Sequence, residues 1–69
     1  IDPSAIIEEN VTIGNFVSIG ANSRISKNSI LEDGVKIGSN VSIGENARIG
    51  MNVVFHDDTI VGKNFTVFG

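Results

Sequence analysis

The segment VVFHDD, residues 53–58, contains the only histidine of the chain, and two aspartates follow it directly. An imidazole titrates near neutral pH, so His56 could act as a general base toward a hydroxyl or an amine. A neighbouring carboxylate can fix the tautomer of an imidazole and stabilise its cation, a role that Asp57 or Asp58 could fill. The same three residues could instead form a solvated surface turn without chemistry, and both interpretations stay open.

A metal site is a third interpretation of this segment, and the spacing argues against it. A mononuclear site usually needs three or four ligands, whereas the side chains of three consecutive residues diverge. The chain has no cysteine, which excludes thiolate ligands and disulfides. We therefore expect no metal.

Composition excludes other classes of function. The net charge is −3 and the five basic residues are scattered, so no basic stripe is available and nucleic acid is not an expected partner. No apolar run approaches the roughly 20 residues of a membrane span, and no segment has the pattern of a signal peptide. The lack of cysteine fits a reducing compartment, and we expect a cytoplasmic protein.

A six-residue period runs through the whole chain. Every sixth residue is aliphatic or phenylalanine, with no insertion or deletion: Ile7, Ile13, Ile19, Ile25, Leu31, Ile37, Ile43, Ile49, Phe55, Val61 and Val67. The residue two positions earlier is small or β-branched in all units but one, and the residue between them is usually polar. This alternation predicts a short strand with one buried face in each unit.

The rest of each unit has the composition of a turn. Glycine often follows the core residue and asparagine often lies three residues after it, and both tolerate the positive φ of tight bends. Three bends closing a triangle use 18 residues, so 69 residues make about 3.8 coils joined by parallel hydrogen bonds. We predict an all-β, single-domain triangular solenoid over residues 1–69, with side chains 18 residues apart stacked inside.

Two further predictions follow from this stacking. The asparagines at positions 10, 28, 46 and 64 share one corner, and we expect their side-chain amides to form a hydrogen-bonded ladder. Several apolar residues face outward, and so many on one short chain indicate contact with another surface. They are Ile6, Phe16, Ile30, Val54, Ile60 and Phe68.

The units VTIGNF, VSIGAN, VKIGSN, VSIGEN and ARIGMN resemble the hexapeptide repeat of the left-handed parallel β-helix. The resemblance covers residues 5–69, and the left hand is implied by it alone. This repeat is similar to that of bacterial acyltransferases. They are typically homotrimers, and their active site lies between the β-helices of neighbouring subunits. The resemblance implies acyl transfer from acyl-CoA or acyl-carrier protein to a sugar or amino-sugar, with His56 as the base. On this resemblance we expect the outward apolar residues to contact a subunit of a trimer, a neighbouring domain or an acyl chain.

Proteins with a different kind of function contain the same repeat. Related coils form non-catalytic tails on sugar nucleotidyltransferases, so a purely structural role is the alternative. The segment FTVFG ends within a repeat and has no polar cap, so we expect the natural protein to continue with further coils or a C-terminal helix. Flanking sequence would discriminate the two classes, because a nucleotidyltransferase has a Gly-rich phosphate loop upstream.

Overall fold

The computed structural model describes residues 1–69 and contains eleven strands, each two residues long, and no helix. One strand begins every six residues, so the predicted six-residue unit is confirmed. The strands are β1 (Ile6–Ile7), β2 (Thr12–Ile13), β3 (Ser18–Ile19), β4 (Arg24–Ile25), β5 (Ile30–Leu31), β6 (Lys36–Ile37), β7 (Ser42–Ile43), β8 (Arg48–Ile49), β9 (Val54–Phe55), β10 (Ile60–Val61) and β11 (Thr66–Val67).

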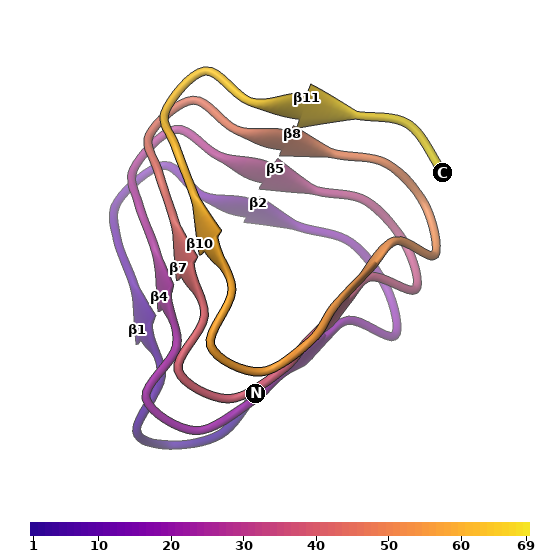
Figure 1. The fold of residues 1–69 in the computed structure, drawn as a ribbon. Coiled ribbons are helices and arrows are strands. Elements are labelled where there is room, and N and C mark those ends of the chain that lie inside the picture. Colours follow the sequence, from indigo (N-terminus) through magenta and orange to yellow (C-terminus); the bar gives the residue numbers. More distant parts are fainter.

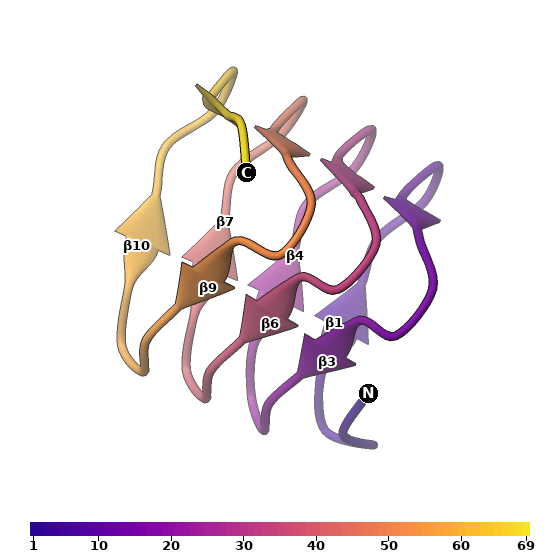
Figure 2. The same cartoon turned by 90° about the vertical axis from the view of Figure 1, so that its right-hand side faces the viewer.

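The strands form three parallel sheets, which are the faces of a triangular prism (Figure 1). We call them the first face (β1-β4-β7-β10), the second face (β2-β5-β8-β11) and the third face (β3-β6-β9). Paired residues are 18 apart: Ile7 lies opposite Ile25, and Ile25 lies opposite Ile43. In the side view successive coils lie side by side, from β1 at the right to β10 at the left (Figure 2). The prediction of an all-β parallel solenoid with an 18-residue register is therefore confirmed, whereas its left hand stays a prediction from the resemblance.

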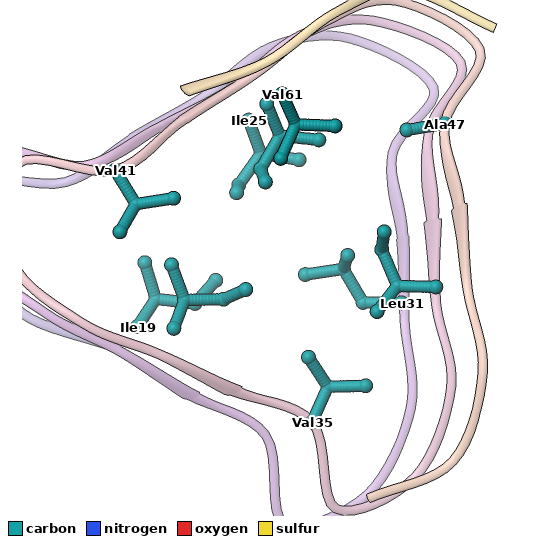
Figure 3. Close-up of a cluster of buried hydrophobic side chains, with 10 residues drawn as sticks. Ile19, Ile25, Leu31, Val35, Val41, Ala47 and Val61 are labelled. Atoms are coloured by element: carbon teal, nitrogen blue, oxygen red, sulfur yellow. The ribbon is translucent and has the colours of Figure 1, made fainter. Parts of the chain in front are cut away.

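The core is a set of aliphatic columns inside the prism. Ile25, Leu31, Ile43 and Ile49 are completely buried, and the labelled side chains of Figure 3 converge on the axis from all three faces. Ile7, Ile13 and Val67 pack against this cluster from the end coils and are only partly buried. Burial of apolar surface along the axis stabilises the fold, and backbone hydrogen bonds between successive coils add to this.

The corners carry a left-handed residue at every sixth position from Asn10 to Asn64. Nine of these ten residues are not glycine, and their φ angles lie between 58° and 64°. Seven are asparagine, the non-glycine residue that tolerates this region best; the others are Phe16, Gly34 and Asp58. The period of six thus has a conformational cause: the chain needs one left-handed residue for each bend.

The predicted ladder of asparagine side chains is wrong. None of these amide groups takes part in a hydrogen bond; the ladder along that corner is made by the main chain instead. The N–H groups of Asn28, Asn46 and Asn64 donate to carbonyl oxygens one coil earlier, at 3.2, 3.1 and 2.8 Å. Asparagine is present at these positions for its backbone conformation.

The outward position of the apolar set is confirmed for five of its six members, which are exposed by half or more of their surface. Ile30 lies between Thr12 and Arg48 on the second face and is only half-buried. Met51 is a further exposed apolar side chain that the period did not single out. The structure contains no helix with the length and apolarity to cross a membrane.

Candidate functional site

His56 lies directly after β9, at the corner where the chain turns from the third face to the first. Phe55 packs inward against the core and is partly buried, while His56 is exposed. This corner borders an open depression on the third face, where β6 and β9 lie side by side (Figure 2). The depression is lined by Lys36, Ile37, Gly38, Val54, Phe55, His56 and Asp57.

The absence of a side chain at Gly38 allows this corner to stack closely on the coil before it. A Cβ atom at Gly38 would lie 2.8 Å from the backbone nitrogen of Asp57, which is closer than real Cβ atoms approach. The Gly38 N–H donates to the Phe55 carbonyl at 2.9 Å and so fixes the strand end that precedes His56.

The carboxylate of Asp57 ties its corner to the preceding coil. Its Oδ1 accepts a hydrogen bond from the Ser39 N–H at 2.8 Å. Asp33 makes the same contact with the Asn15 N–H at 2.7 Å, again 18 residues apart. Because Asp33 makes this contact far from the histidine, we interpret the contact as one that stabilises the stacking of coils.

Asp58 is the left-handed residue of this corner, with φ 64°. Its N–H donates to the Ser39 carbonyl at 2.9 Å, and its side chain is exposed. The structure thus brings His56, Asp57 and Asp58 together on one turn, but no hydrogen bond or ion pair joins the imidazole to either carboxylate. The catalytic roles assigned to the three residues stay predictions.

A fourth polar residue at this corner was missed by the sequence analysis. The Thr59 hydroxyl donates a hydrogen bond to the His56 carbonyl oxygen at 2.8 Å. The only signal in the sequence is that Thr59 occupies an inward position, two residues before a core aliphatic, where most units have alanine or valine.

Two buried serines occupy the same inward position in other units. Ser23 is 1% exposed, and its hydroxyl donates to the Gly38 carbonyl at 2.6 Å and accepts from the Val41 N–H at 3.1 Å. Ser29 is also fully buried and makes equivalent contacts with Gly44 and Ala47 at 3.0 and 3.3 Å. Hydroxyls at inward positions therefore bond to the backbone at the corners.

The ion pairs of the chain lie away from this corner. Arg24 pairs with Glu8 on the first face, and Arg48 pairs with Glu32 on the second at 3.3 Å. The hydrogen bond from the Arg24 side chain, and secondly the one from the Lys27 N–H, lower the pKa of Glu8. Lys36 forms no ion pair, so the depression beside His56 has an unpaired positive charge. No group of three histidine, aspartate or glutamate side chains is arranged to hold a metal ion.

Comparison with known sequences identifies the repeat. The family model of the bacterial transferase hexapeptide (six repeats) matches residues 16–48. No curated protein matches the chain. The matched range ends before residue 53, so it supports the interpretation of the repeat and is silent about the corner that carries the histidine.

Proposed function

The chain carries the bacterial transferase hexapeptide repeat, and on this premise we propose that it is part of an acyltransferase. The proposed reaction moves an acetyl or longer acyl group from the thioester of acyl-CoA or acyl-carrier protein to a sugar or amino-sugar. The observation that carries the proposal is the position of the single histidine, exposed at the rim of an open depression.

In the proposed mechanism His56 is the general base. Its imidazole accepts the proton of the acceptor hydroxyl or amine while the oxygen or nitrogen attacks the thioester carbonyl. The C–S bond then breaks, and the imidazolium returns a proton to the leaving thiolate. Asp57 and Asp58 are the proposed partners that stabilise the imidazolium; the second oxygen of Asp57 accepts no hydrogen bond in the chain and is free for this role.

The test is turnover of acyl-CoA against a panel of amino-sugars by the intact parent protein. We expect His56→Ala to lower kcat by about 10² or more, because general-base catalysis contributes about that factor. Lys63→Ala, which also changes an exposed residue near a corner, is the matched control and should keep full kcat. Full activity of His56→Ala would remove His56 from the mechanism.

A structural coil, such as the tail of a sugar nucleotidyltransferase, is the second candidate. One observation favours it: the polar groups of the histidine corner already have structural partners, with the Asp57 carboxylate on Ser39 and the Thr59 hydroxyl on the His56 carbonyl. Under this alternative the parent protein transfers no acyl group from any donor, and its repeat serves assembly alone.

A further inference from the structure

The carbonyl that opens the turn is hydrogen-bonded in three of the four corners between the third and first faces, each time by a different kind of donor, whereas the Gly20 carbonyl accepts no hydrogen bond within the chain. In the first of these turns the Asp2 carbonyl accepts from the Ala5 N–H at 3.0 Å, within the main chain. In a later turn the Gly38 carbonyl accepts from a serine hydroxyl at 2.6 Å. In the turn that carries the histidine, the His56 carbonyl accepts from the Thr59 hydroxyl at 2.8 Å.

The serine case shows how a hydroxyl closes such a turn from the coil before it. The Ser23 hydroxyl lies between the ends of the turn 38–41, donating to the Gly38 carbonyl and accepting from the Val41 N–H. One hydroxyl therefore satisfies both backbone groups that a tighter turn would pair directly.

The histidine turn lacks this serine. The residue 18 positions after Ser23 is Val41, which is 1% exposed and has no polar atom in its side chain. Without another donor the His56 carbonyl would have no partner within the chain. Thr59, a further 18 positions on, supplies the donor from within the turn itself.

We propose that Thr59 is a positioning residue for His56. Its hydroxyl holds the His56 carbonyl from one side, while Asp57 anchors the next residue to Ser39 in the preceding coil. Together these two contacts fix the backbone of His56 and Asp57, and so the position of the imidazole at the rim of the depression. The catalytic consequence of this inference rests on the proposed function, whereas its structural part does not.

The first test removes the hydroxyl while keeping the shape of the side chain, as Thr59→Val. Because His56 is the only histidine, its imidazole carbon-bound protons give one set of NMR signals, which report its position directly. We expect Thr59→Val to shift or broaden these signals and to lower kcat by tenfold or more with little change in KM, since small misplacements of a reacting group are costly. Thr59→Ser keeps the donor and should restore both.

The control is Thr66→Val on the outer side of β11, where the hydroxyl makes no hydrogen bond and is exposed. It should leave the histidine signals and kcat unchanged. A second variant, Val41→Ser in the Thr59→Val background, places a hydroxyl where the Ser23 pattern predicts a bridge between the His56 carbonyl and the residue 59 N–H. We expect this double variant to regain sharp histidine signals.

The outcomes separate this inference from the proposed function. Unchanged histidine signals in a folded Thr59→Val protein overturn the positioning role. If Thr59→Val does not fold, the double variant decides: a folded double variant with native histidine signals supports the role, and one with perturbed signals contradicts it. Perturbed signals in Thr59→Val, with no acyl transfer by the unsubstituted protein, would support the positioning role and refute acyl transfer.

Discussion

At the scale of single residues, the backbone conformation of the corners explains more of the sequence than side-chain chemistry does. Seven asparagines occupy left-handed positions, and none of their amide groups is used for hydrogen bonding. Asp58 occupies the same kind of position in the histidine corner. The left-handed conformation alone explains why an aspartate can occupy position 58. The proposed catalytic role of Asp58 is not needed to explain this residue.

Gly34 is the one glycine among the ten left-handed corner residues. Its φ is 76°, and a Cβ atom there would collide with the side-chain oxygen of Asn52 in the next coil. We expect Gly34→Val to lower the free energy of unfolding by about 2 kcal/mol or more, since a β-branched residue is strained in this region. Urea denaturation followed by circular dichroism measures the change.

Gly62→Val in the 69-residue chain is the matched control, because a Cβ atom at Gly62 meets nothing within 4 Å. Equal losses for the two variants would show that the left-handed conformation of Gly34 and its contact with Asn52 do not determine its identity.

At the scale of the elements, strands of two residues are too short to hold the coils together by themselves. Hydrogen bonds from buried hydroxyls at the corners also join one coil to the next. Two-residue strands pair at an 18-residue register, and serines at inward positions bond to the backbone of the next coil. These buried polar contacts replace the apolar packing that valine supplies at the same position elsewhere, so removing one leaves backbone groups without partners.

Ser29→Ala should therefore destabilise the protein even though it makes the core more apolar. The change leaves the Gly44 carbonyl and the Ala47 N–H without the hydroxyl that joins them. We expect a loss of about 1–3 kcal/mol in the free energy of unfolding, the usual cost of unsatisfied buried groups. Ser42→Ala, an exposed serine on the outer side of β7, is the control for urea denaturation and should change stability little. Equal stability of both variants would contradict the structural role of the Ser29 hydroxyl.

The sequence predicted the elements well because their signals are local. The alternation within each unit predicts a strand, and Gly or Asn after Ile13, Ile37 and Ile43 predicts the bend. The contacts of Ser23 and Thr59 were not predictable in this way, because their partners depend on how corners from successive coils stack. The asparagine ladder failed for the same reason: spacing brings Asn28 and Asn46 to one corner but does not determine which of their atoms bond.

The candidate site was only partly predictable for a related reason. The sequence shows that His56 is the only histidine, and its position after a strand predicts a side chain that points outward. The structure confirms that His56 is exposed. The contact of Asp57 with Ser39 could not be derived, since the two residues meet only through the 18-residue stacking. A carboxylate next to a histidine in sequence is thus weak evidence for a pair, because the solenoid gives that carboxylate another partner.

At the scale of the whole molecule, the three edges of the prism differ in character. The edge between the first and second faces carries Glu9, Lys27, Glu45 and Lys63, which alternate in sign from coil to coil. The edge between the third and first faces carries the histidine. Three of the exposed apolar side chains, Phe16, Met51 and Phe68, follow strands of the second face and gather toward the edge that leads to the third.

We expect this apolar edge to be the contact surface of the homotrimer that the family resemblance implies. Met51 is 55% exposed and lines an open depression on the second face together with Ile30, so a charge there would have to be buried in an assembly. Light scattering of the parent protein should give three times the subunit mass, and Met51→Glu should reduce it. Ile60→Glu on the first face, where the side chain is 83% exposed, removes comparable apolar surface outside the proposed contact and should leave the trimer intact. A trimer that dissociates with Ile60→Glu but survives Met51→Glu would move the interface to the first face, and a parent protein that stays monomeric would refute the assembly.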